Sequence, residues 1–156
     1  MAAQELFTTT LYNDANLISY YRFENNITDS KGVNALTDSS TSDTASGQFG
    51  HGRSFTPNAY LYTAASSSLP SGNGSFTIHC WMKFNSNGQA GFLPSFGADG
   101  GTPTAALLYL STAATLNFEG PSSTNLCRSN TVLSTGTWYM VDATFDGSTM
   151  TLYING

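Results

Sequence analysis

Residues 144–156 read TFDGSTMTLYING, and this stretch decides the fold class of the chain. Asp146-Gly147 stands between two runs in which apolar and polar residues alternate, and Asn155-Gly156 follows the second run. Asp-Gly and Asn-Gly are strong hairpin signals, because both supply the positive φ angles that tight turns between antiparallel strands need. The stretch therefore predicts an antiparallel hairpin, with one strand before Asp146 and a second strand at Thr149–Ile154.

The second turn, at Asn155-Gly156, predicts a returning strand that the given sequence does not contain. We therefore expect a domain that continues past Gly156 and a fold that lacks its last strands. A sheet edge left without its neighbour exposes backbone donors and acceptors that can pair with another chain. We expect the isolated chain either to form a homodimer through this edge or to be marginally stable.

The composition is typical of an extracellular β-protein. Charged residues make up 10% of the 156 residues, against roughly 25% in an average soluble protein. A net charge of −5 disfavours binding to nucleic acid or to an anionic membrane. The longest apolar stretch, Ala105–Leu110, is far shorter than the ~20 residues that span a bilayer. Met1–Phe7 lacks the basic and apolar regions of a secretory signal peptide.

Many short β-strands are predicted, and no segment has a sustained helical period. The clearest strand is Ser75–Phe84, in which every second side chain from Phe76 to Phe84 is apolar. Further strands are expected at 17–23, within 36–48, within 47–55, and at 60–63, 92–96, 107–110, 116–119, 126–129 and 138–145. Residues 1–16 are expected to be a tail or a first edge strand. The pattern predicts an all-β fold, an antiparallel two-sheet sandwich (jelly roll), formed by residues 17–156 as one domain.

The two cysteines, Cys80 and Cys127, leave the redox compartment undecided. Their number permits one disulfide, and their spacing matches no metal motif. A free cysteine behaves as a small buried hydrophobe, so we favour two free thiols on strands, with a disulfide as the alternative.

Four stretches, taken in order, resemble the laminin G-like, concanavalin A-like jelly-roll domains. LISYYRFE at 17–24 is similar to their opening strand, and GHGRSF at 50–55 to the glycine turn before their next strand. SFTIHCWMK at 75–83 resembles their central strand, and GTWY at 136–139 together with the final hairpin is the most specific match. The resemblance covers residues 17–156 and implies the same two-sheet fold.

The resemblance also implies that the strands at 75–84 and 138–145 are neighbours. Their faces away from the core would then place His79 and Trp81 beside Trp138, Met140 and Asp142. Asp142 is a departure, because the family usually has a small apolar residue there and a carboxylate in a strand is costly if buried. Sugar-binding sandwiches use aromatic faces for stacking and Asp or Asn for hydroxyl groups. The candidate ligand-binding residues are therefore His79, Trp81, Trp138 and Asp142; the alternative is that loops cover the tryptophans and His79 or a backbone amide holds Asp142.

Many laminin G-like domains bind a calcium ion, which takes about six to eight oxygen ligands. Glu24, Asp29 and Asn34, together with Asn26, lie in one polar loop and are the candidate calcium ligands. Asp and Asn are also ordinary turn formers, so a loop without metal is the alternative. The acidic residue that closes the family's domains is absent from the given sequence.

Catalysis is not expected. The glucanases of this superfamily need two or three carboxylates on one strand, whereas Glu5, Glu24 and Glu119 are isolated. His51 and His79 are accompanied by no Gly-x-Ser-x-Gly motif. We predict a non-catalytic recognition or adhesion module that is extracellular, at the cell surface or on a virion, with carbohydrate as the leading ligand and protein as the second. A structural spacer in a large surface protein is the alternative, and a glycoside hydrolase is less favoured.

Overall fold

The computed structural model describes residues 12–64, 66–70, 72–88, 91–97, 106–120 and 126–156. Every regular element that lies wholly within this part of the chain is a β-strand, as predicted. The chain divides into two compact units, Met1–Leu69 and Pro70–Gly156. The domain boundaries expected from the sequence stay predictions. No helix among the described residues has the length and apolar character needed to cross a membrane.

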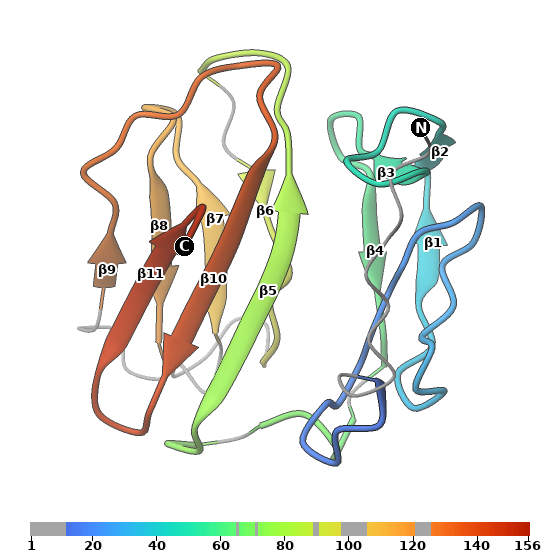
Figure 1. Cartoon of the computed structure of the whole chain (residues 1–156), viewed down its shortest axis with the longest axis vertical. Coiled ribbons are helices and arrows are strands. Elements are labelled where there is room, and N and C mark those ends of the chain that lie inside the picture. Colours follow the sequence, from blue (N-terminus) through green and yellow to red (C-terminus); the bar gives the residue numbers. More distant parts are fainter. Residues whose placement is uncertain (1–11, 65, 71, 89–90, 98–105, 121–125) are drawn as a thin grey trace. The chain divides into compact units, whose positions relative to one another are not determined.

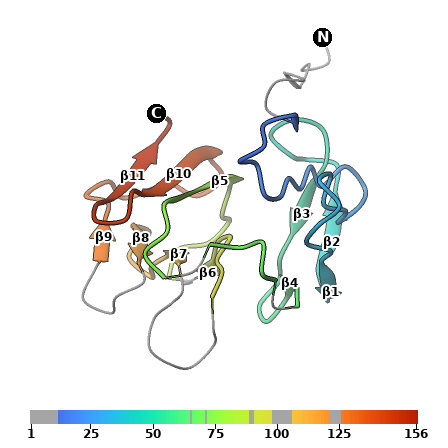
Figure 2. The ribbon, with the colours of Figure 1, turned by 90° about the horizontal axis from the view of Figure 1, so that it is seen from below.

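The second unit consists of two antiparallel sheets that pack face to face (Figures 1 and 2). The first sheet has the order β11-β10-β5, with β5 at Phe76–Met82, β10 at Tyr139–Phe145 and β11 at Met150–Ile154. The second has the order β6-β7-β8-β9, with β6 at Gly91–Phe92, β7 at Leu107–Leu110, β8 at Leu116–Glu119 and β9 at Leu126–Arg128. This arrangement confirms the predicted two-sheet sandwich of the jelly-roll class.

The core of this unit lies between the two sheets because each strand alternates apolar and polar side chains. Phe76 of β5 contacts Phe96 and Phe118 edge to face, with ring centroids 4.9 and 6.0 Å apart. Most of the fully or nearly fully buried apolar residues come from the strands of both sheets: Ile78, Met82, Leu108, Leu110, Leu116, Phe118, Val141, Ala143 and Phe145. Burying each large side chain contributes about 1.5–3 kcal/mol, so the interface between the sheets is the main source of this unit's stability.

The hairpin predicted at Asp146-Gly147 is confirmed. Gly147 has a φ of 101°, and the Asp146 Oδ1 atom accepts hydrogen bonds from the backbone N–H groups of Ser148 and Thr149, at 2.8 and 2.7 Å. Asn155 also has the positive φ, 60°, that its sequence predicts. Its backbone N–H donates to the Met140 carbonyl oxygen, and its Oδ1 accepts from the Met140 N–H, at 2.9 and 3.0 Å. Asn155 therefore extends the pairing of β11 with β10.

The first unit contains two short antiparallel pairs. β1 (Thr37–Ser39) pairs with β4 (Tyr60–Tyr62), and β2 (Ser42–Thr44) pairs with β3 (Gly52–Ser54). The segment 36–48, predicted to hold one strand, thus holds two. Residues 12–16 form no strand, and the rest of the predicted tail, residues 1–11, lies outside the described residues.

The strand predicted at residues 17–23 is wrong. The structure has only an isolated bridge there, between Tyr21 and Asp29. Phe23 and Asn25 have φ angles of 56° and 57°, which turn the chain out of the extended conformation. The Tyr20 N–H donates to the Asp29 carboxylate at 2.9 Å, so a side chain replaces the expected strand partner.

Both cysteines are free thiols, as favoured from the sequence. Burial, reinforced by the nearby charge of Asp142, raises the pKa of the Cys80 thiol to about 12. Cys80 is therefore protonated at neutral pH and acts as an apolar residue beside the core.

Candidate functional site

The candidate site is the face of the β11-β10-β5 sheet that points away from the core, which we call the outer face. β5 contributes every second residue to it, and β10 and β11 do the same in register. Its residues are Thr77, His79, Trp81, Met140, Asp142, Thr144, Thr151 and Tyr153. The prediction that the strands carrying His79 and Asp142 are neighbours is thus confirmed.

His79, Asp142 and Tyr153 form one row across the three strands. Asp142 lies opposite His79 on one side and opposite Tyr153 on the other. The His79 Nδ1 atom is 2.7 Å from the Asp142 Oδ1 atom, and the two side chains are 51% and 25% exposed. This contact explains how a carboxylate is accommodated in the middle of a strand, because a hydrogen-bonded partner offsets the cost of partial burial. It agrees with the alternative expected for Asp142, that His79 holds it.

The aromatic residues of the outer face differ in their surroundings. Trp81 is 36% exposed and lies opposite Met140, so loops do not bury it. Trp138, just before β10, lies under the Lys83 ammonium group, whose nitrogen is 4.9 Å from the ring centroid. Tyr153 is 45% exposed and belongs to the same row as Asp142.

Lys83 and Tyr153 were not among the residues predicted from the sequence. Lys83 continues the alternation of Thr77, His79 and Trp81, and Tyr153 follows from the alternation of the final strand. The alternation alone would place both residues on the outer face, but their positions beside Asp142 and Trp138 follow only from the register and the contacts in the structure. As ligand-binding residues, His79, Trp81, Trp138 and Asp142 stay predictions.

A second polar group of residues lies on the β6-β7-β8-β9 sheet and was also not predicted. Asn117 is 1% exposed although it points away from the core, and its Oδ1 accepts a hydrogen bond from Arg128 Nε at 2.8 Å. The Tyr109 hydroxyl donates to Glu119 Oε1 at 2.8 Å, and this hydrogen bond raises the pKa of Tyr109. These hydrogen bonds link side chains of β7, β8 and β9 and give each polar group a partner within the sheet, so a structural role explains their presence.

The predicted calcium ligands do not fit a calcium site as the structure places them. The Asp29 carboxylate, in a residue 3% exposed, accepts four backbone hydrogen bonds, two at each oxygen: Tyr20 and Lys31 at Oδ1, Val33 and Asn34 at Oδ2. A carboxylate has about four lone-pair sites, so none is left for a metal. The Asn34 side chain instead bonds Ser19 and Ser68.

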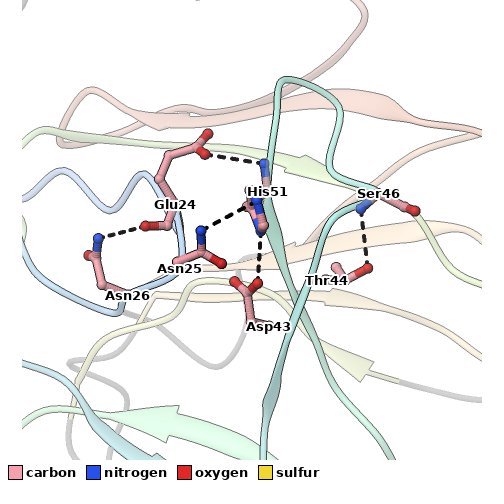
Figure 3. A network of polar contacts seen from close by, with 7 residues as sticks. All are labelled: Glu24, Asn25, Asn26, Asp43, Thr44, Ser46 and His51. Carbon is pink, nitrogen blue, oxygen red and sulfur yellow. Dashed lines mark hydrogen bonds and ion pairs between the residues drawn. The ribbon is translucent and has the colours of Figure 1, made fainter.

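Glu24 belongs to a different network, drawn in Figure 3 with Asn25, Asn26, Asp43, Thr44, Ser46 and His51. Its Oε2 atom accepts a hydrogen bond from the His51 backbone N–H at 3.3 Å. The His51 ring places Nδ1 2.8 Å from Asp43 Oδ2 and Nε2 3.4 Å from the Asn25 amide nitrogen. Across the described residues, no three His, Cys, Asp or Glu side chains form a group that could hold a metal ion.

Comparison with known proteins gives one result. The sequence profile of the concanavalin A-like lectin/glucanases superfamily, laminin G type, matches residues 55–156. No significant match was found among the curated proteins or among the solved structures. The matched range includes both sheets of the second unit and confirms the resemblance recognised in the sequence; its extension to residues 17–54 stays a prediction. The chain therefore belongs to the concanavalin A-like lectin/glucanase superfamily as a laminin G-like domain.

Proposed function

We propose that this chain is a non-catalytic recognition module that binds carbohydrate on the outer face of the β11-β10-β5 sheet. The observation that carries the proposal is a partly exposed indole, Trp81, next to the row His79–Asp142–Tyr153. Family membership supports a binding module in general terms. The choice of carbohydrate is our inference from the chemistry of this face.

The outer face combines the two kinds of group that a sugar needs. An aromatic side chain presents a flat apolar surface on which the C–H groups of a pyranose ring can lie. Asp142 uses Oδ1 for His79, which leaves Oδ2 to accept hydrogen bonds from hydroxyl groups. A few such polar groups beside an apolar surface are typical of small-molecule sites.

The same face argues for binding without hydrolysis. Glycosidases place two carboxylates about 5–9.5 Å apart on either side of the scissile bond. Asp142 is the single carboxylate among the residues of the outer face, and His79 already holds it. We propose that the superfamily's glucanase chemistry does not operate at this site.

A protein ligand is the second candidate, favoured by the position of β11. Among the described strands, β11 ends the order β11-β10-β5, and its sequence MTLYI carries no charge. An uncharged edge strand can add a strand from a second copy or from another protein. The low content of charged residues, 10%, supports an extracellular, cell-surface or virion setting for either function.

A glycan array with the wild-type chain and three variants tests the carbohydrate proposal. Trp81→Ala and Asp142→Ala should each weaken binding about tenfold or more, because each removes one half of the proposed site. Thr77→Ala is the matched control, since Thr77 lies on the same strand and face but in the row on the far side of His79 from Trp81, and the proposal gives it no contact with the sugar. Circular dichroism melts verify folding. Full binding by both folded site variants would remove the site, and reducing sugar released from a bound polysaccharide would contradict the non-catalytic assignment.

A further inference from the structure

We propose that the carbohydrate bound by the outer face is acidic, and that the Lys83 ammonium group binds the carboxylate of a uronic acid residue. This inference rests on the proposed carbohydrate site and specifies its ligand class. The observation behind it is the Lys83 ammonium group, which lies beside the aromatic residues of that site and has no carboxylate partner among the described residues.

Among the described basic residues with known contacts, Lys83 is the one that donates to no oxygen acceptor. Lys31 also lies over a ring, that of Tyr12, with its nitrogen 5.5 Å from the centroid, but it donates to backbone carbonyl oxygens as well. Arg53 pairs with Asp38, and Arg128 donates to the Asn117 side chain. The contact of Lys83 is the Trp138 ring, 4.9 Å from its nitrogen. The ion pairs of the described residues include His51–Asp43, Arg53–Asp38 and His79–Asp142, and Lys83 takes part in none of these. A ring attracts a cation but does not neutralise its charge, so the ammonium group keeps the capacity to bind an anion.

The position of Lys83, one residue past the end of β5, places this cation next to the proposed sugar. Lys83 and Trp81 are two residues apart on the same face, which corresponds to about 7 Å along an extended chain. That distance is about the width of one sugar ring with its substituents. A pyranose lying on Trp81 therefore has Lys83 beyond one edge and His79 beyond the other.

The two ends of the site also differ in charge, which gives an acidic sugar one preferred orientation. Asp142 lies opposite His79, at the end away from Lys83. A carboxylate on the sugar is attracted to the ammonium group and repelled by Asp142, whereas hydroxyl groups can donate to Asp142. The uronate carboxylate thus points to Lys83, and the opposite hydroxyl groups point to Asp142 and His79.

One cation per site predicts recognition of a single acid group rather than of a polyanion as a whole. The chain has a net charge of −5, which opposes long-range attraction of a highly charged polymer. Binding should therefore weaken only slightly with added salt, unlike the steep dependence seen when many charges are neutralised together.

Isothermal titration with matched polysaccharides tests the inference. The probes are oligomers of galacturonate, of mannuronate and of hyaluronan, each beside the same oligomer with its carboxylates reduced to alcohols. For at least one pair, the wild-type chain should bind the acidic form about threefold or more tightly, as expected for a partly exposed ion pair. Lys83→Met keeps an unbranched side chain over Trp138 and should abolish the difference, whereas Lys83→Arg keeps the charge and should preserve it.

The outcomes separate this inference from the function on which it rests. Equal wild-type affinity for the acidic and reduced forms, or a preference that survives in Lys83→Met, overturns the role of Lys83. Binding of neutral glycans on the array without binding of the acidic oligomers overturns the acidic ligand class and leaves the proposed function standing. Binding of neither class overturns both.

Discussion

Asp29→Asn is the substitution that tests how the loop of the first unit is held together. The Asp29 carboxylate accepts backbone hydrogen bonds from Tyr20, Lys31, Val33 and Asn34. Asparagine has nearly the same shape, but it replaces one oxygen with an amide group that donates and cannot accept. Because each oxygen serves two donors, either orientation of the new amide leaves two backbone N–H groups without an acceptor.

The size of the effect follows from these two lost partners. A buried donor left without an acceptor costs about 1–3 kcal/mol. Val33 is 55% exposed, so water can hydrate part of the opened site and reduce the cost. We expect a loss of about 2 kcal/mol in the free energy of local opening, which corresponds to roughly 30-fold faster amide exchange.

Hydrogen exchange measured by NMR at the amides of Tyr20, Lys31, Val33 and Asn34 checks this value in the wild-type and variant chains. Asp43→Asn is the matched control, because Asp43 is more exposed and pairs only with the His51 ring among the contacts described. Less than threefold acceleration at all four amides would refute the reasoning. Equal acceleration in the control would refute it as well.

The same carboxylate should make this loop sensitive to acid. Burial alone would raise the pKa of Asp29, but the four backbone hydrogen bonds together outweigh burial and hold the pKa below its usual range. A carboxyl group with a lowered folded-state pKa stabilises the fold above its unfolded pKa of about 4, and this stabilisation is lost as the pH falls through the folded value. Protection of the Tyr20 and Asn34 amides should therefore fall below about pH 4, and fall less in Asp29→Asn. Identical acid profiles would contradict this account.

Three further predictions concern a glycine of the first unit, Cys80 and calcium. Gly50→Ala should destabilise the first unit more than Gly32→Ala in urea melts. Both glycines have positive φ, 78° and 75°, and Gly32 faces open space. A Cβ atom at Gly50 would lie 2.7 Å from Glu24 Oε1 and would displace this flexible side chain, so the extra cost is the hydrogen bond that Glu24 Oε2 accepts from the His51 N–H. Equal losses would show that backbone strain of about 1–2 kcal/mol is the whole effect. Iodoacetamide at pH 8 should modify Cys80 in the native chain far more slowly than in urea, because the pKa of this thiol is raised to about 12 in the folded chain. Above about pH 9 the thiol of the unfolded chain ionises while the folded one stays protonated, so the free energy of unfolding declines as the pH rises towards 12. Melting temperatures should be the same in calcium chloride and in EDTA, since Asp29 has no free lone pair; a higher temperature in calcium would reveal a bound ion.

Most of the second unit could be predicted from the sequence because local signals and burial agree there. The strands expected at 107–110 and 116–119 have the bounds that the structure gives β7 and β8. Residues 107–119 carry little charge, and the strands are separated by turn-forming residues, so composition and tertiary packing favour the same conformation. The turn at Asp146-Gly147 was predicted correctly for the same reason, since Gly147 adopts its positive φ without strain.

The first unit departs from the prediction where long-range polar contacts replace local preference. Residues 17–23 have the aromatic and β-branched composition of a strand. The N–H of Tyr20 binds the Asp29 side chain, however, and Phe23 and Asn25 turn the chain with positive φ. A propensity scale describes how a side chain suits a pleated surface, and it contains no information on a carboxylate nine residues later that accepts the backbone donor.

The candidate site could be predicted in part because Asp142 is an unusual residue for the middle of a β-strand. Asp142 is unfavourable in the middle of a strand, and the structure compensates this cost with His79 across the register. A residue that is unfavourable in a strand but has a compensating partner is expected at functional positions, since a purely structural strand would carry a β-branched or aromatic residue there.

Tyr153 and Lys83 could not be recognised in this way, because tyrosine is common within strands and lysine is common at their ends. They become part of the site only through the register that sets Tyr153 opposite Asp142 and through the position of Lys83 over Trp138. Asp142, recognisable in the sequence, therefore located the face, whereas Lys83, which supplies the proposed preference for acidic sugars, required the structure.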